Sequence, residues 1–379
     1  MQRVTDVFET DLRNLSERGR LRELRERSGI DFTSNDYLGL AESEELKWAA
    51  GDALARGVPV GSGGSRLLRG NHPEHEALES EAAAYFGAET ALYFGGGYIA
   101  NFAIFSTLPQ RGDLVVHDEL IHASVHEGLR RGRADFVGVP HNNVDAFDAA
   151  IVRWRAAGGK GRPWLSVESL YSMDGDSPNL AALFAVAKRH EAMVVIDEAH
   201  ATGVLGPQGR GLAAAFEGRD NVISLHTCGK ALGTVGGFIL APRTIRDFLV
   251  NRARPFIFAT APSPLIAAIT RVALELSRTN PERRDRLARL VQFAGSELRR
   301  RCNIEPSGSH ILPVIIGADQ AAVALAASLK RRGFDIRAIR PPTVAEGTAR
   351  LRIALTANVD EAIVADLFEA LAEDMRKAT

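Results

Sequence analysis

An aspartate and a histidine three positions apart are the residues of this chain best placed for chemistry. Asp197 follows the apolar run Met193–Ile196, and His200 comes just after it. If the run is a buried parallel strand, the carboxylate lies at the sheet edge where ligands bind in open α/β folds. A buried carboxylate is costly unless it meets a cation or a hydrogen-bond donor. The nitrogen of a pyridine ring would be such a partner, although Asp197 could instead cap the next helix.

A lysine further along the chain supplies the reactive group that such a ring needs. Lys230 follows a second apolar run and is flanked by small residues. A desolvated lysine is nucleophilic toward an aldehyde and forms a Schiff base with it. Alone, Lys230 would be interpreted as a surface lysine. Together with Asp197 and His200 it predicts a pyridoxal-phosphate site, in which the aspartate keeps the ring protonated and electron-poor.

Two features of the sequence suit the phosphate of that cofactor. Gly95–Gly97 precede Tyr98 between a predicted strand and a predicted helix, and Thr227 carries a hydroxyl three residues before Lys230. Bare N–H groups at a helix N-terminus bind anions, so the glycine turn suits a phosphate. The glycines match neither the dinucleotide fingerprint nor the P-loop pattern.

Two further side chains are candidates for the same site. His122 offers a flat ring that could stack on a pyridine ring. The spacing of His122 and His126 would also suit a metal ion, but no third ligand has a clear place. Ser172 follows the predicted strand that ends at Glu168, where it could reach the cofactor or serve as a turn residue.

The elements that must position these residues follow an alternating order. Short apolar runs alternate with segments of helical periodicity, which predicts an α/β fold with a mostly parallel sheet covered on both faces. The predicted strands are Ala91–Phe94, Asp113–His117, Asp135–Val139, Trp164–Glu168, Met193–Ile196, Val222–His226 and Gly237–Leu240.

The ends of the chain have a different organisation from its middle. Apolar residues at helical spacing predict an amphipathic helix over residues 6–27. Beyond residue 280 the order of predicted helices and strands changes, which indicates a smaller α+β domain, with one of its strands over Asp335–Arg340. We therefore expect an N-terminal helix and arm (1–45), a large α/β domain (46–280) and a small C-terminal domain (281–379).

Composition argues against several classes of protein. The chain has 379 residues, of which 45% are hydrophobic and 25% charged, and its net charge of -1 offers no basic field for nucleic acid or an anionic membrane. Cys228 and Cys302 are far apart, so no disulfide framework is indicated. The sequence has no signal-peptide pattern and no apolar run of about 18 residues, so we expect a cytoplasmic protein.

These residues resemble the motifs of the α-oxoamine synthases, a family of fold-type-I pyridoxal-phosphate transferases, and the resemblance extends over nearly the whole chain. The matching segments are 35–40, 61–79, 96–101, 122–124, 172–176, 197–203 and 230–233. The segment 340–352 resembles the branch of the family that serves biotin biosynthesis.

The resemblance implies a role for each candidate residue. Lys230 would hold the cofactor, Asp197 would contact its ring nitrogen, and His200 its ring hydroxyl. The residues that would stack on the cofactor or line it are His122, Gly97, Tyr98, Ser172 and Thr227. The residues that would meet the substrates are Arg352 and Asn35 at the amino-acid carboxylate, Arg22, Arg340 and Thr343 toward the acyl group, and His122 as well.

The reaction that the resemblance implies is a decarboxylative condensation of L-alanine with a pimeloyl thioester of coenzyme A or an acyl carrier protein. The family forms homodimers with the active site at the subunit interface. The nearest alternative uses glycine or serine with a different acyl-CoA. A nucleotide-binding oxidoreductase lacks support because the dinucleotide fingerprint is absent, and the retained Lys230, Asp197 and His200 argue against a catalytically silent partner subunit.

The chain departs from the family pattern near these residues. Cys228 and Gly229 stand where an aromatic residue and a serine are usual, so one hydroxyl near the phosphate is missing. The segment between Arg22 and Phe32 is shorter than usual, and Ala345-Glu346 replace a common Pro-containing pair near the acyl site. These departures concern phosphate binding and acyl length, not the type of reaction.

Overall fold

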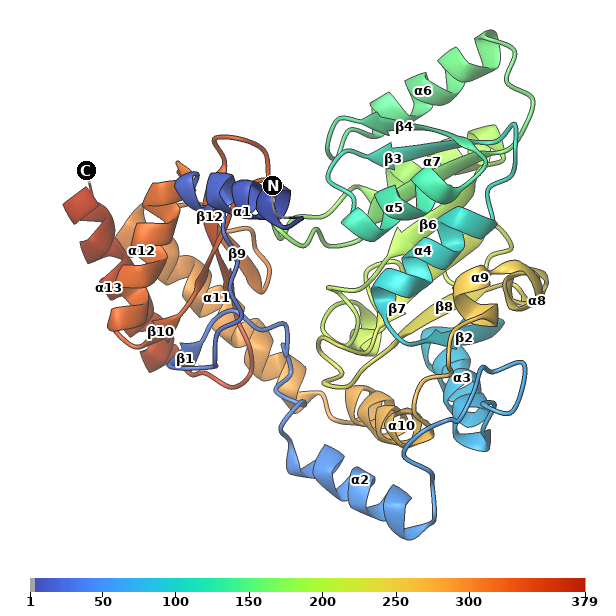
Figure 1. The fold of residues 1–379 in the computed structure, drawn as a ribbon, viewed down its shortest axis with the longest axis horizontal. Helices are drawn as coiled ribbons and strands as arrows, with labels where there is room; N and C mark the ends of the chain where they lie inside the picture. The colour runs from blue at the N-terminus through green and yellow to red at the C-terminus, as the bar shows by residue number, and fades with distance from the viewer. Residues whose placement is uncertain (1–3, 379) are drawn as a thin grey trace. The chain divides into compact units, whose positions relative to one another are not determined.

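The structure, a computed structural model, describes residues 4–378 and divides them into two compact units (Figure 1). The large unit contains residues 36–172 and 176–284. The small unit contains the described residues up to Asn35 and those from Asp285 onward. It also contains Met173–Gly175, although the chain on either side of this short segment belongs to the large unit.

A seven-stranded sheet forms the centre of the large unit. Its strand order is β2-β8-β7-β6-β5-β3-β4, in which β8 is antiparallel to both neighbours and the other pairs are parallel. The strands are β2 (Thr90–Phe94), β3 (Leu114–Asp118), β4 (Asp135–Val139), β5 (Pro163–Glu168), β6 (Met193–Asp197), β7 (Val222–Thr227) and β8 (Gly237–Ala241). All except β4 are buried along their whole length, which explains their continuous apolar runs. The predicted α/β class is confirmed.

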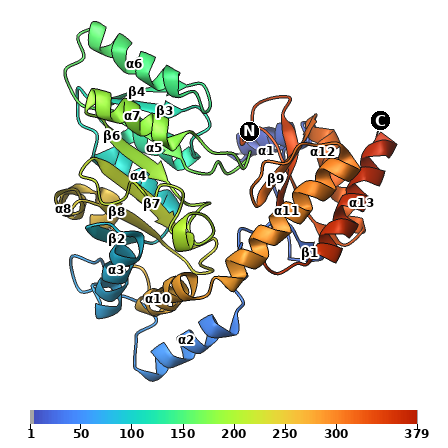
Figure 2. The same cartoon turned by 180° about the vertical axis from the view of Figure 1, so that it is seen from behind.

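Helices cover both faces of this sheet (Figures 1 and 2). One face packs against α4 (Gly97–Thr107), α5 (Ala123–Arg131), α8 (Arg243–Arg252) and α9 (Arg254–Ile257), and the other against α6 (Val144–Ala156) and α7 (Leu180–His190). Side chains of a strand alternate between the faces. In β6, Met193 and Val195 join the α4 side, whereas Val194 and Ile196 join the α7 side. Asp197 therefore falls on the α4 side.

Three more helices of the large unit lie beyond the edge strand β2. They are α2 (Glu44–Ala55), α3 (Pro73–Phe86) and α10 (Pro264–Thr279), and α10 packs against both of the others. The N-cap His72 and Pro73 start α3, and a left-handed Gly87 ends it. A short 3₁₀ turn, η1 (Pro207–Gly209), lies between β6 and β7.

The small unit is built on a three-stranded antiparallel sheet. Its strand order is β11-β12-β9, with β9 (Ile311–Gly317), β11 (Arg337–Ile339) and a fully buried β12 (Ala349–Ala354). Its helices are α11 (Glu282–Cys302), most of which belongs to this unit, α12 (Asp319–Arg331) and α13 (Glu361–Ala378) (Figure 2). The strand predicted over Asp335–Arg340 is instead two pieces, because β10 (Phe334–Asp335) pairs separately with β1 (Ile30–Asp31).

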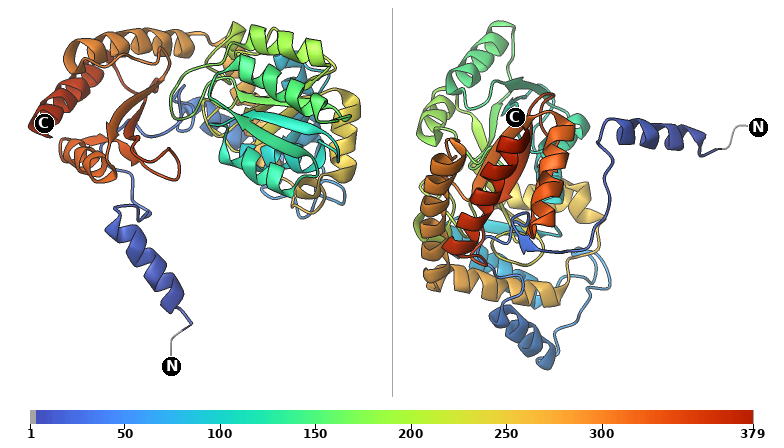
Figure 3. Two further views of the ribbon diagram at one scale, coloured as in Figure 1. Left: turned by 90° about the horizontal axis from the view of Figure 1, so that it is seen from above. Right: turned by 90° about the vertical axis from the view of Figure 1, so that its left-hand side faces the viewer.

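The N-terminal helix is shorter than the sequence pattern predicts. The prediction of a helix through residue 27 is wrong, since α1 (Asp6–Glu17) ends at Glu17 and Gly19 takes a left-handed φ of 65°. Contacts within the small unit hold this turn: Arg20 pairs with Asp319 at 2.6 Å, and Arg340 donates a hydrogen bond to the Gly19 carbonyl. Figure 3 shows α1 projecting from its unit, and none of its residues is buried. No helix in the described chain is long and apolar enough to cross a membrane.

Candidate active site

Asp197 ends β6 as a buried carboxylate that is held by two donors. The Asn101 side-chain amide from α4 donates to Asp197 Oδ2 at 2.7 Å, and the Ala199 backbone N–H donates to Oδ1 at 2.9 Å. Hydrogen bonds to a carboxylate favour its ionised form, which burial alone would disfavour. The site therefore contains a negative charge that is fixed in position from both sides.

A chain of polar contacts extends from Asp197 through the interior to His122. Asn101 also donates to Ser124 Oγ at 3.1 Å, and Ser124 Oγ lies 2.7 Å from His122 Nδ1. Asn101 and Ser124 were not among the site residues predicted from the sequence. The available signal was a single amide within the apolar run of α4, because a polar group buried among apolar ones needs partners.

His122 is the N-cap of α5, and its surroundings keep the ring uncharged. Burial lowers the pKa of His122, Asp197 partly opposes this effect, and the charge of Lys230 adds to it. The ring meets Tyr98 edge-on, with centroids 6.1 Å apart. His126, the other residue considered for a metal pair, packs edge-on against His117. Among the described residues no group of three or more His, Cys, Asp or Glu is arranged to hold a metal ion.

His200 is buried and is oriented by a tyrosine from a distant part of the chain. Tyr37 Oη lies 2.6 Å from His200 Nδ1, and Tyr37 itself is fully buried. This contact joins residues 163 positions apart, so local sequence patterns gave no sign of it.

Lys230 lies on the loop that follows β7, within a turn of defined shape. Backbone hydrogen bonds from Thr234 to Cys228 and from Gly233 to the Lys230 carbonyl close the turn. Gly233 has a φ of 65°, and a Cβ there would come within 2.5 Å of the Ala41 backbone nitrogen. The turn therefore needs glycine, and the backbone that carries Lys230 is fixed.

An open cradle for an anion lies at the start of α4. The helix begins at Gly97 after Gly96, which provides no side-chain cap, and a Cβ at Gly95 or Gly96 would meet nothing within 4 Å. A Cβ at Gly97 would lie 3.4 Å from Thr227 Oγ1. The first N–H groups of α4 and the Thr227 hydroxyl thus adjoin an open space, which suits a phosphate.

Glu168 lies beside Asp197 at the end of the neighbouring strand, and Ser172 follows it on the chain. Glu168 ends β5 as the register partner of Asp197, and its Oε2 accepts a hydrogen bond from the Ser172 backbone N–H at 3.1 Å. The site residues of the large unit thus come from the carboxyl ends of β5, β6 and β7 and from the starts of α4 and α5. This is the edge where ligands bind in open α/β sheets.

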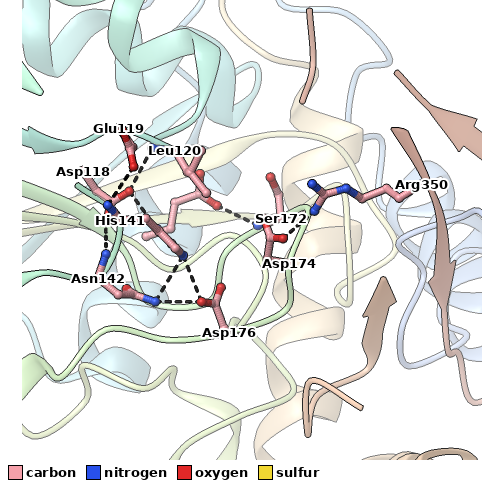
Figure 4. Close-up of polar contacts among 10 residues, drawn as sticks. Asp118, Glu119, Leu120, His141, Asn142, Ser172, Asp174, Asp176 and Arg350 are labelled. Carbon is pink, nitrogen blue, oxygen red and sulfur yellow. Dashed lines mark hydrogen bonds and ion pairs between the residues drawn. The ribbon is translucent and has the colours of Figure 1, made fainter. Parts of the chain in front are cut away.

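A charged histidine holds the chain just after Ser172. His141 lies between Asp118, at the end of β3, and Asp176, with its two ring nitrogens 2.9 Å from the respective carboxylates (Figure 4). Partial burial lowers the pKa of His141, but the hydrogen bonds to Asp118 and Asp176 outweigh it and raise the pKa to about 10. Asn142 donates to both carboxylates, from its backbone to Asp118 and from its side chain to Asp176.

The candidate substrate residues other than His122 belong to the small unit. Arg352 is buried on β12 and donates to Asn35 Oδ1 at 3.0 Å, so these two predicted neighbours lie together. Arg350, two positions earlier on the same face, pairs with Asp174 of the 173–175 segment (Figure 4).

The three residues predicted toward the acyl group lie in another part of the same unit. Arg22 and Arg340 both line a cavity of about 560 Å³, and the Thr343 backbone N–H donates to the Arg340 carbonyl at 3.0 Å. Burial first, and then the charge of Arg22, lower the pKa of Arg340. Arg25 lines the cavity as well, which makes it strongly cationic.

The chain is similar to known proteins over almost its full length. A family model described as aminotransferase class I and II matches residues 27–371. The 8-amino-7-oxononanoate synthase of Anaeromyxobacter dehalogenans is 43% identical over 348 residues, which cover 91% of this chain and 86% of that protein. The 8-amino-7-oxononanoate synthase of Azoarcus sp. is 40% identical over 387 residues, which cover 98% of each.

Solved structures agree with this result. A serine palmitoyltransferase from S. paucimobilis with bound pyridoxal phosphate and myriocin matches with a TM-score of 0.89 at 27% identity, over 98% of each chain. The 8-amino-7-oxononanoate synthase of Francisella tularensis matches with a TM-score of 0.79 at 26% identity, over 93% of this chain and 99% of that one.

The His141 ion pairs predict a specific dependence of stability on pH. Because the pKa of His141 is raised from 6.5 to about 10 on folding, its stabilising effect is fully present below pH 6.5 and is lost as the pH rises through about 10. We expect the melting temperatures of the wild type and His141→Gln to differ most near pH 6 and to converge toward pH 10. Asp176→Asn, which removes one partner, should show a smaller change. A difference that stays constant across this range would contradict the ion-pair assignment.

Proposed function

The chain belongs to the aminotransferase class I and II family, among the 8-amino-7-oxononanoate synthases, and we propose that it condenses L-alanine with a pimeloyl thioester in biotin biosynthesis. The observation that carries the chemistry is the grouping of Asp197, His200 and Lys230 at the carboxyl ends of β6 and β7. The choice of alanine and a pimeloyl thioester is supported by the similar proteins, which are named 8-amino-7-oxononanoate synthases. The new bond joins the α-carbon of alanine to the thioester carbonyl carbon, and the thiol and carbon dioxide leave.

The residues of the large unit fit pyridoxal phosphate as the cofactor. Lys230 would hold it covalently, Asp197 would accept a hydrogen bond from the protonated ring nitrogen, and the α4 start with Thr227 would bind its phosphate. His200, His122, Tyr98 and Ser172 would complete its surroundings. When bound, the cofactor supplies an electron sink for the pair released at the α-carbon.

The protein's own groups have three tasks in this reaction. The Lys230 amine takes the proton from the α-carbon of alanine. Arg352 donates a hydrogen bond to Asn35 and binds the alanine carboxylate. This contact orients the bond between the α-carbon and its hydrogen, which Lys230 breaks. The imidazole of His122 is uncharged, so it adds no positive charge that would compete with the pyridine ring of the cofactor for Asp197.

The acyl assignment is supported by the cationic cavity of the small unit. A pimeloyl chain ends in a carboxylate or its methyl ester, and a polar end needs a partner when it is buried. Arg22 and Arg340 provide such partners, whereas a long saturated chain would need only apolar walls. Serine with a palmitoyl thioester is the second candidate pair of substrates, because of the match to serine palmitoyltransferase.

We also propose a homodimer located in the cytoplasm. Val7, Phe8 and Leu12 on α1 are each more than half exposed, and burial against a second copy would remove this apolar surface from water. The two free cysteines accord with a reducing compartment.

Replacing Lys230 tests the central assignment. Lys230→Ala should abolish condensation while the fold survives, since proton transfer alone contributes roughly 10²–10⁴ to the rate. Borohydride should attach the cofactor to the wild-type peptide containing residue 230 and to no peptide of the variant, as followed by mass spectrometry. Lys188→Ala, at an exposed position of α7, is the control and should behave as wild type. Wild-type turnover by Lys230→Ala would refute the assignment.

The missing hydroxyl near the phosphate can be restored. A Cβ at Gly229 would meet the Thr234 carbonyl oxygen at 3.7 Å, an ordinary contact, so a serine fits there. A hydrogen bond to a charged group is worth about 1.5–3 kcal/mol, so Gly229→Ser should lower the cofactor Kd roughly tenfold or more. Gly229→Ala adds the carbon without the hydroxyl and should leave the Kd unchanged. Equal Kd values for the two variants, measured by fluorescence titration, would contradict the prediction.

Arg340 tests the acyl end of the substrate. Arg340→Met should lower kcat/KM for the pimeloyl thioester by roughly tenfold or more and leave alanine binding intact, because one hydrogen-bonded charge is lost. The measurement is a competition among pimeloyl, succinyl, acetyl and palmitoyl thioesters, each with alanine, glycine and serine. Arg331→Met, at an exposed position of α12, is the matched control. If the wild type prefers the palmitoyl or acetyl thioester, the substrate proposal is wrong and the cofactor chemistry still stands.

A further inference from the structure

Glu168 is a second buried carboxyl group at the edge of the sheet that carries Asp197. The two residues end the neighbouring strands β5 and β6 and are register partners in a parallel pair. Adjacent strands lie about 4.8 Å apart, and register partners point to the same face of the sheet. Glu168 is 2% exposed and Asp197 6%, so water screens neither group well.

The two carboxyl groups have unequal sets of donors. Both oxygens of Asp197 accept hydrogen bonds, from Asn101 and from the Ala199 backbone. Glu168 Oε2 accepts a single one, from the Ser172 backbone, and Glu168 Oε1 is buried with no hydrogen-bond partner among the described residues. A negative charge on an oxygen that lacks a donor is far more costly to bury than a neutral acid.

Most of the charges around Glu168 also favour its neutral form. Asp197 from β6 and Asp118 from β3 are negative, Lys230 from the loop after β7 is positive, and the Tyr171 hydroxyl lies nearby. Burial first and Asp197 second raise the pKa of Glu168 well above its usual range, and Lys230 and the Ser172 N–H oppose this only in part. Two buried carboxyl groups this close do not both ionise readily, and the donors decide which one does.

We propose that Glu168 is held as a neutral carboxylic acid and serves as a positioning residue, so that Asp197 is the only one of this pair of carboxyl groups that is ionised beside Lys230 and the ring nitrogen. An ionised Glu168 would stabilise the ammonium form of Lys230 and so withdraw the free amine that accepts the α-proton. With Glu168 neutral, the single charge of Asp197 remains for the ring nitrogen. The role toward Lys230 rests on the proposed function, whereas the protonation of Glu168 does not.

Infrared difference spectroscopy tests the protonation directly. At neutral pH the wild-type protein should show the carbonyl stretch of a protonated carboxyl group, and Glu168→Gln should lack it. Burial also raises the pKa of Glu198, so the assignment depends on the loss of a band in the Glu168 variant and not on its mere presence. Identical carboxyl bands in the wild type and Glu168→Gln would overturn the proposal.

A pH titration of the visible band of the cofactor-loaded protein tests the effect on Lys230. Glu168→Gln replaces one neutral group with another of the same shape, so the midpoint should stay at the wild-type value. If Glu168 were ionised, the loss of an anion near Lys230 would lower the midpoint by about 1–3 pH units, and that result would overturn the proposal. If Glu168→Gln does not fold, Glu168→Met, which is neutral and of similar length, replaces it in both measurements.

The outcome for substrates is independent of these two measurements. A protein that shows the expected band and an unchanged midpoint, but does not condense alanine with a pimeloyl thioester, would refute the proposed function and leave the state of Glu168 established.

Discussion

The burial of one negative charge at the end of β6 sets requirements that much of the large unit meets. Asp197 loses most of its hydration there, so it needs fixed donors on both oxygens. One donor is the backbone N–H of Ala199, two residues further along the chain. The other is the side chain of Asn101, so α4 must pack on the face of the sheet to which Asp197 points. The start of that helix is also the open glycine turn. The position of the charge and the position of the anion cradle are therefore set by a single helix.

The strands of the large sheet were predictable because all of them except β4 are buried along their whole length, so that their apolar runs are continuous. The observed strands β2 to β8 differ from the predicted ones by only one residue at some ends. The N-terminal helix was predicted too long because apolar spacing continues past Glu17, while a left-handed Gly19 and the contacts of Arg20 end the helix. Tertiary contacts of this kind leave no periodic signal in the local sequence.

The reactive residues of the candidate site were predictable from the sequence, whereas the residues that support them were not. Residues that carry reactive groups, such as Lys230 and Asp197, are recognisable from their types and from the runs that precede them. Residues that support them, such as Tyr37, act only through segments that folding brings close. Glu168 was visible in the sequence as the last residue of a strand, but its significance depends on the register that places it beside Asp197. Register between strands distant in sequence cannot be read from either strand alone.

Three neighbouring strands end in carboxyl groups, and each is accommodated by a different physical means. Asp118 on β3 faces the positive ring of His141, which Asp176 shares. Asp197 on β6 has two donors and remains available to a cationic ring. Glu168 on β5 lies between them in the sheet and has a single donor, so the two flanking charges and its burial leave protonation as the least costly state. The solutions for Glu168 and Asp197 depend on each other, because an ionised Glu168 would place a second negative charge beside Lys230 and stabilise its ammonium form. The order of charges along this edge therefore belongs to the chemistry of the site as much as the reactive residues do.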